Sequence, residues 1–175
     1  MRAAAVILTL LVAQAGAKSF FESFGPKDFY KTFSWTNPDT GKVSQYAIST
    51  TELTFDEAEK YCQTVFRGHL AAPSTQAEND FLKKTFGRLE LPRDIIMMWF
   101  GGFKPKTTWE FTNGEEMTTG AYVTGWSTTA PNGIAAQDNP EFADYRYAAY
   151  GSKDQEYGWI MFPQPGPQWP FICEA

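Results

Sequence analysis

The sequence predicts an α+β domain, because two amphipathic helical patterns lie close together early in the chain and short strand patterns mostly follow them. The helical patterns begin near Thr54 and Thr75, and the chain becomes rich in strands and loops after Pro92. A doubly wound sheet would alternate strands with helices along the chain, so this order argues against that class. No internal repeat or linker divides the sequence, which indicates a single domain.

The first residues have the pattern of a secretory signal peptide. A basic start at Arg2 precedes an apolar run, and small residues follow near Ala17, so we expect cleavage after residues 1–17. The run is shorter than the roughly 20 apolar residues that a membrane span needs, and no later segment approaches that length. We therefore expect a secreted, extracellular protein without a membrane span.

Residues 18–42 form an aromatic-rich N-terminal extension, ahead of a domain that we place at residues 43–175. So many aromatic side chains must be shielded from solvent, either by packing on the domain or by self-association. The extension ends in a turn signal at residues 37–41, and the alternation in residues 42–49 predicts a strand.

The first helical pattern follows this strand. Thr54 and Glu57 have capping-box spacing, and apolar residues recur at helical intervals from Phe55 through Cys62, which predicts a helix with Cys62 on its buried face. The second pattern repeats the box with Thr75 and Glu78. The expected apolar face consists of Ala77, Phe81, Leu82 and Phe86, and we expect the helix to end at Gly87.

The second half of the chain predicts strands joined by turns. Strand patterns occupy residues 97–103, 144–150 and 158–162, and Asn113-Gly114 is typical of a turn. Residues 127–144 have no usable periodicity. A loop of that length inside a compact domain is usually functional or disordered, so this segment is the first place to expect a site.

Cys62 and Cys173 are the only cysteines of the chain. Export to an oxidising compartment favours a disulfide, and two cysteines allow a single intramolecular pairing. That bridge would close a loop of roughly 110 residues, which is worth on the order of 4–5 kcal/mol in the chain-entropy treatment. Unpaired thiols or an intermolecular bridge are the alternatives.

Charge and composition exclude several functions. The formal net charge is −5 and there is no basic cluster, so we expect no nucleic-acid partner. His69 is the only histidine, which leaves too few groups for a nucleophilic triad or a zinc site. We expect no enzyme and no catalytic residue, and a structural role for His69.

Six segments in order resemble the C-type lectin-like domain family, over roughly residues 43–174. They are TFDEAEKYC (54–62), GHLAAPSTQAENDFL (68–82), WFGG (99–102), WEFTNGE (109–115), GWSTTAPN (125–132) and FICE (171–174). The resemblance implies two helices, antiparallel strands and a long loop region. It also implies that Cys62 pairs with Cys173, while the inner disulfide of most members is absent.

The family's calcium-dependent sugar site is degenerate in this sequence. Calcium takes six to eight oxygen ligands, which the family supplies from a Glu-Pro-Asn or Gln-Pro-Asp triplet, a further acid and a Trp-Asn-Asp triplet. Here Ala130 replaces the first acid, and Ile160 and Met161 replace the last two donors. We therefore expect no calcium cofactor at that position and no metal ligands.

The resemblance and the loop together predict where a ligand binds. The candidate ligand-binding residues carry oxygen or amide groups in the loop: Asn132, Gln137, Asp138, Asn139, Glu141 and Asp144. A solvated acidic loop or a shifted, weaker cation site would also fit them. Aromatic residues flank the loop and could form core or a ligand surface: Trp126, Tyr145, Tyr147, Tyr150 and Tyr157.

The function expected from the resemblance is carbohydrate binding without the usual calcium site, with a glycan as partner. The alternative is a protein-binding or structural lectin-like module without sugar affinity, with an extracellular protein as partner.

Overall fold

The computed structural model of the chain describes residues 29–89, 97–117, 125–128, 133, 139–153 and 156–175. The expected signal peptide and the first part of the aromatic extension lie outside these residues. The proposed domain boundaries therefore remain predictions.

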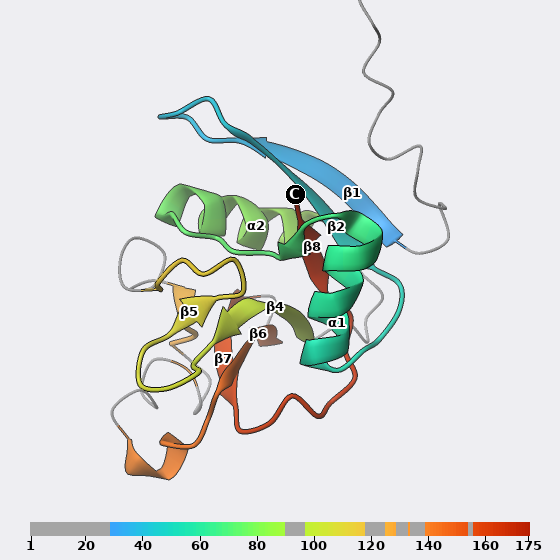
Figure 1. The fold of residues 1–175 in the computed structure, drawn as a ribbon. Helices are drawn as coiled ribbons and strands as arrows, with labels where there is room; N and C mark the ends of the chain where they lie inside the picture. Colours follow the sequence, from blue (N-terminus) through green and yellow to red (C-terminus); the bar gives the residue numbers. More distant parts are fainter. Residues whose placement is uncertain (1–28, 90–96, 118–124, 129–132, 134–138, 154–155) are drawn as a thin grey trace, which may run out of the picture.

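The first antiparallel sheet joins the two ends of the described chain, in the order β1-β2-β8-β3. Its strands are β1 (Phe29–Thr36), β2 (Val43–Ser49), β3 (His69–Leu70) and β8 (Ile172–Glu174). The last strand lies in the middle of the sheet, where Cys173 pairs with Ala47 of β2 on one side and Leu70 of β3 on the other. In Figure 1 the β1–β2 hairpin lies above the two helices.

The described part of the aromatic extension belongs to this sheet as the edge strand β1. The turn before β2 forms as expected: Oδ1 of Asn37 accepts the N–H of Asp39 at 2.9 Å, and Gly41 takes a φ of 71°. Phe33 stacks on Tyr46 of β2 with ring centroids 5.4 Å apart. Some of the aromatic side chains are thus covered by the domain itself.

The second antiparallel sheet has the order β5-β4-β6-β7. Its strands are β4 (Met97–Phe103), β5 (Glu110–Phe111), β6 (Tyr147–Lys153) and β7 (Glu156–Phe162). The expected turn at Asn113-Gly114 follows β5, with Gly114 at φ 88°. A short 3₁₀ segment, η4 (Pro140–Phe142), precedes β6. Figure 1 shows this sheet below α2 and beside α1.

The first helix, α1 (Phe55–Tyr61), confirms the capping-box prediction. The N–H of Thr54 donates to Oε2 of Glu57 at 3.1 Å. The helix continues as a five-residue π-helical segment, η2 (Cys62–Phe66), which ends at Arg67 in the left-handed region with φ 64°. Phe55 and Cys62 are buried, as the apolar spacing predicts.

The second helix, α2 (Gln76–Arg88), differs from the sequence prediction in two respects. Gly87 does not end it, because the helix runs on to Arg88. Ala77 is exposed, whereas the polar side chains of Glu78 and Asn79 are buried. Partners on other elements supply hydrogen bonds to both: Tyr46 donates to Glu78, and Tyr150 donates to Oδ1 of Asn79 at 2.7 Å, while Nδ2 of Asn79 has no partner among the described residues.

The disulfide between Cys62 and Cys173 confirms the predicted pairing, with the two Cα atoms 5.4 Å apart. It ties η2 to β8 within a buried cluster that includes Trp99 of β4 and Phe171. Trp99 also links β4 to the segment just before β8, since its backbone N–H donates to the carbonyl of Pro170 at 2.9 Å. Two helices and two antiparallel sheets make the α+β fold that the sequence predicts.

None of the helices in the described part of the chain has the length and apolar character needed to cross a membrane.

Candidate functional site

Two of the positions expected to have lost their calcium ligands, Ile160 and Met161, are buried on β7, the edge strand of the second sheet. Met161 is 1% exposed and pairs with Ala148, and Ile160 is 7% exposed and pairs with Ala149 of β6. Gly151 makes room for Ile160, because a Cβ there would lie 1.9 Å from Cδ1 of Ile160. An alkyl group and a thioether supply no oxygen ligand, so these residues do not fit the family's sugar-binding calcium ion.

Three of the six predicted ligand-binding residues are described, and all three are exposed: Asn139, Glu141 and Asp144. Oδ1 of Asn139 caps η4 by accepting the N–H of Glu141 at 3.0 Å. This side-chain oxygen is therefore already used locally. Ala130, Asn132, Gln137 and Asp138 lie outside the described residues, so their part in a site remains a prediction.

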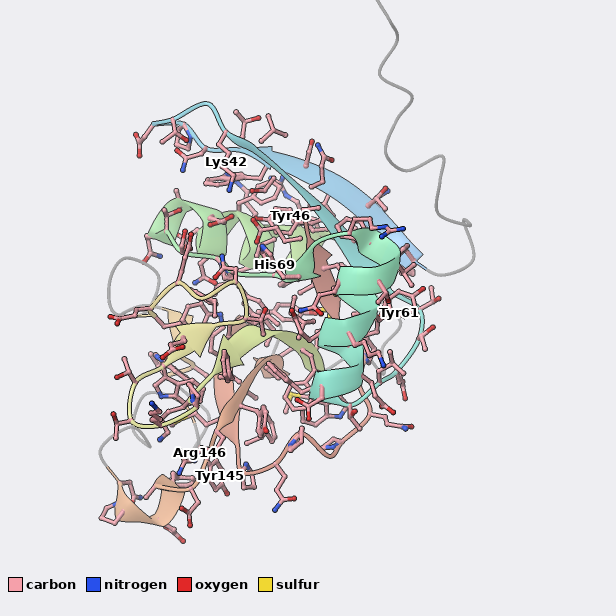
Figure 2. All side chains as sticks on the ribbon, viewed as in Figure 1. Lys42, Tyr46, Tyr61, His69, Tyr145 and Arg146 are labelled. Atoms are coloured by element: carbon pink, nitrogen blue, oxygen red, sulfur yellow. A yellow bond between two sulfur atoms is a disulfide. The ribbon has the colours of Figure 1, made fainter. Side chains whose placement is uncertain are left out.

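The aromatic residues around the loop divide into two groups. Trp126 and Tyr150 are buried core residues, whereas Tyr145, Tyr147 and Tyr157 are only partly buried. Figure 2 places Tyr145 and Arg146 at the lower end of the molecule, well away from Tyr46 and His69. Of these five aromatic residues, Tyr147 lines a pocket beside α1.

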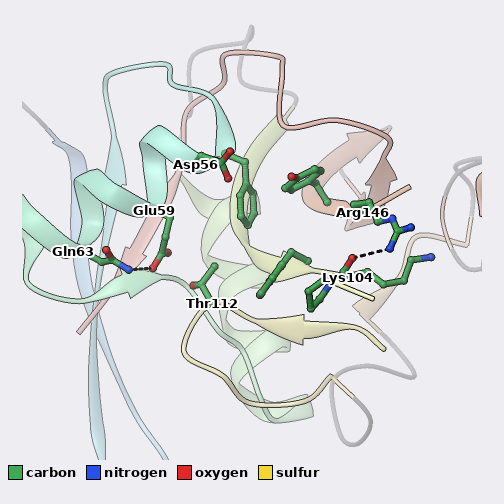
Figure 3. A pocket seen from close by; sticks show the side chains of 10 residues that line it. Asp56, Glu59, Gln63, Lys104, Thr112 and Arg146 are labelled. Carbon is green, nitrogen blue, oxygen red and sulfur yellow. Dashed lines mark hydrogen bonds between the residues drawn. The ribbon is translucent and has the colours of Figure 1, made fainter. Parts of the chain in front are cut away.

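This pocket of about 640 Å³ lies between α1 and the segments that carry Lys104 and Arg146. Its aromatic and proline lining is Phe55, Phe103, Pro105 and Tyr147, and its polar lining is Asp56, Glu59, Gln63, Lys104, Thr112 and Arg146. Figure 3 shows the acidic groups on the helix side and the two cationic residues across from them. Pockets of this size are typical of small-ligand sites.

Of the three described loop residues predicted to bind ligand, none lines this pocket, although the charge of Asp144 acts on Lys104 at its cationic side. Burial lowers the pKa of Lys104, the charge of Arg146 lowers it further, and the carboxylate of Asp144 opposes both. The carboxylate of Asp144 at the end of the loop therefore lies close enough to Lys104 to influence its charge state. Sequence reasoning missed Asp56 and Arg146 because each resembles an ordinary exposed charge in its own segment.

The phenol of Tyr147 experiences charges from both walls of the pocket. Burial raises its pKa, the negative charge of Asp56 raises it further, and the positive charge of Arg146 opposes them. The acid and the guanidinium therefore both lie close enough to influence this phenol, which lines the same pocket.

A second, small polar cavity of about 70 Å³ borders the buried carboxylates of Glu78 and Glu174. Both groups have protein donors: Ser74 donates its N–H to Glu78 at 3.0 Å, and Ala72 donates its N–H to Glu174 at 2.9 Å. Burial raises the pKa of Glu78 to about 7, and the nearby charge of Glu174 adds to this shift. These contacts join α2 to β2 and β8, which is a structural role.

No group of three or more histidine, cysteine or acidic side chains in the described part of the chain is placed to hold a metal ion. The single histidine, His69, has its Nδ1 atom 2.8 Å from the carbonyl oxygen of Leu70. That contact holds the imidazole beside its own strand.

Comparison with solved structures places this fold among lectin-like domains. Human lithostathine is 21% identical, with a TM-score of 0.57 over 81% of this chain and 86% of that one. The SPL-1–GlcNAc complex gives 18% identity, a TM-score of 0.57, and coverage of 75% and 87%. The C-type lectin domain of murine dendritic cell inhibitory receptor 2, in complex with N-glycan, is 17% identical, with a TM-score of 0.56 over 86% of this chain and 98% of that one.

These identities are low, so the likeness shows the fold alone. A search of curated protein sequences returns no significant match. The family described as the lectin C-type domain matches residues 51–157, which is more than half of the chain. The chain therefore belongs to the lectin C-type domain family.

Proposed function

We propose that this protein is a secreted, non-enzymatic carbohydrate-binding protein that recognises a glycan without the family's usual calcium site. The family supports sugar binding as the starting expectation, and two structures of the same fold are complexes with GlcNAc and with N-glycan. The signal-peptide pattern in residues 1–17 and the Cys62–Cys173 disulfide support export.

The observation that carries the proposal is the burial of Ile160 and Met161 in β7. Both side chains are buried and neither contains an oxygen atom, so neither can ligate calcium. Sugar recognition must then rest on direct hydrogen bonds and aromatic contacts. The loop residues Asn132, Gln137, Asp138, Asn139, Glu141 and Asp144 are proposed contacts.

The experiment is a glycan array probed with the mature protein, once with calcium and once with excess chelator. The proposal expects the same retained glycans in both buffers, and weaker retention by the variant Asn132→Ala if the loop makes the contacts. An array without any retained glycan in either buffer would refute carbohydrate binding.

A protein-binding or structural module is the second candidate, and the edge strand β1 favours it. One edge of β1 pairs with β2, and no described strand covers the other. Tyr30 on this strand is 38% exposed. Concentration-dependent assembly in sizing experiments that no sugar competes with would favour this candidate over glycan binding.

A further inference from the structure

The pocket beside α1 has aromatic surface on one side of its volume. The ring centroids of Phe55 and Tyr147 are 5.0 Å apart, and those of Phe55 and Phe103 are 6.4 Å apart. Phe55 is only 3% exposed, so Phe103 and Tyr147, both partly buried, supply the accessible ring surface. Aromatic faces carry a negative quadrupole and therefore attract the weakly positive C–H groups on one face of a pyranose ring.

On the helix side, Asp56 offers an unused acceptor. It lies exposed in the first turn of α1 and accepts no side-chain hydrogen bond from a described residue. Its neighbour Glu59 is already occupied, because its two oxygens accept the N–H of Leu70 at 2.8 Å and the amide of Gln63 at 2.7 Å. Asp56 is thus the carboxylate available to a ligand, and Glu59 orders the wall around it.

On the opposite side, the backbone fixes the orientation of Arg146. Its Nη1 atom donates to the carbonyls of Lys106 at 2.7 Å and of Lys104 at 3.4 Å (Figure 3 draws the contact with Lys104). A guanidinium has five N–H donors in a planar fork, so donors remain on the groups that these carbonyls do not use. Lys104 is engaged elsewhere, with Nζ 5.5 Å from the ring centroid of Trp109.

The charges of this lining balance: Asp56 and Glu59 oppose Lys104 and Arg146. A polyanion would meet the carboxylates and a polycation would meet the guanidinium, so neither is favoured. A hydroxyl group both donates and accepts hydrogen bonds, and vicinal hydroxyls can serve Asp56 and Arg146 at once. Neutral hexoses and N-acetylhexosamines combine such hydroxyls with an apolar ring face.

We infer that this pocket is a calcium-independent binding site for a neutral pyranose unit of a glycan, which stacks on Tyr147 and Phe103 and hydrogen-bonds to Asp56 and Arg146. The inference rests on the proposed function and moves its site from the long loop to the face beside α1. Arg146 and Tyr147 follow Asp144 by two and three residues, so the pocket lies close to the end of the loop.

The test is binding of printed neutral hexose and N-acetylhexosamine glycans in excess chelator, with variants of both walls. Asp56→Asn removes the ionic acceptor and Arg146→Lys removes the planar fork, and each should weaken binding about 10- to 100-fold. Asp39→Asn in the β1–β2 turn and Arg88→Lys at the end of α2 are the matched controls, since both residues are exposed and lie outside the pocket. Unchanged thermal unfolding of the wall variants shows that folding is intact.

The outcomes separate the two proposals. Loss of binding in both wall variants, with the controls and Asn132→Ala unchanged, supports the pocket. Glycan retention that survives both wall substitutions overturns the pocket while leaving carbohydrate binding in place. Absence of retention by the unsubstituted protein refutes carbohydrate binding, and the pocket inference with it.

Discussion

Tyr46 of β2 donates its hydroxyl to Oε1 of Glu78 on α2, and both side chains are buried. The contact joins the first sheet to the second helix. The same carboxylate accepts the N–H of Ser74, and Glu174 on β8 lies close enough to influence it. A buried acid between a sheet and a helix should make the stability of this domain depend on pH.

We predict that stability falls as pH rises from about 4.5 to about 7. Burial is the main cause that raises the pKa of Glu78 from its ordinary value of 4.5 to about 7 in the folded state. In that window the unfolded chain has released this proton and the folded chain still holds it, so increasing pH favours unfolding. The loss should be on the order of 2 kcal/mol, measured by urea unfolding across the window.

Glu78→Gln is the control for this prediction, because an amide cannot ionise. Other acids titrate in the same window, so the relevant quantity is the difference in unfolding free energy between the two proteins. That difference should change with pH and then level off above about pH 7. A pH-independent difference would show that Glu78 titrates normally.

Gly68 allows β3 to lie against the last strand. A Cβ at this residue would lie 1.8 Å from the carbonyl oxygen of Glu174, so Gly68→Ala must displace backbone. We predict a loss of about 1–3 kcal/mol in unfolding free energy. Gly87→Ala is the matched control, since a Cβ there meets nothing within 4 Å on α2 and should stabilise by about 0.4–1 kcal/mol. Equal effects of the two substitutions would contradict this account.

Removal of the Cys62–Cys173 bridge releases a long loop in the unfolded chain. The cysteines are separated by 111 residues, so the double variant Cys62→Ser, Cys173→Ser should lose about 4–5 kcal/mol, and more if the buried hydroxyls stay unpaired. Equilibrium urea unfolding measures the change in stability. For the unsubstituted protein, intact mass after alkylation without reductant should show no modified thiol. Two alkylated cysteines in the unsubstituted protein would show that the bridge is absent.

Restoring the family's calcium-ligand types in β7 should damage the fold. Met161→Asp places a carboxylate at a position that is 1% exposed, which we expect to cost about 3 kcal/mol or more. Met161→Leu keeps the volume and should cost less than about 1.5 kcal/mol. Thermal unfolding of the Met161→Asp variant with and without calcium tests this prediction. A calcium-dependent recovery of its melting temperature would mean that a metal site survives at this position.

The local sequence is sufficient to predict the helix that leads into Cys62. The box formed by Thr54 and Glu57 marks the start of α1, and the apolar spacing correctly places Cys62 on its buried face. These signals act within one or two helical turns, so no knowledge of distant residues is needed.

The second helix shows where local patterns fail. Glu78 and Asn79 are buried, and Tyr46 and Tyr150, on strands of two different sheets, donate hydrogen bonds to them. A periodicity count assigns such polar residues to the exposed face and assigns Ala77 to the core. Tertiary hydrogen bonds, which the count does not contain, reverse that assignment.

The pocket was hidden from the sequence for a related reason. Its walls come from α1, from the end of β4 and from the residues that lead into β6, which lie far apart in the chain. Asp56 and Arg146 each resemble a solvated charge in the sequence, and only the fold brings them into the lining of one pocket with Tyr147. The long loop, in contrast, attracts attention because its sequence lacks a regular pattern.

The most direct test of the central claim is calorimetric titration of the mature protein with a neutral glycan retained on the array, in calcium and in excess chelator. We predict the same dissociation constant in both buffers, because Ile160 and Met161 provide no calcium ligand. Binding that appears only in calcium, together with a calcium-induced rise in melting temperature, would contradict the account, since a metal that binds only the native state must stabilise it.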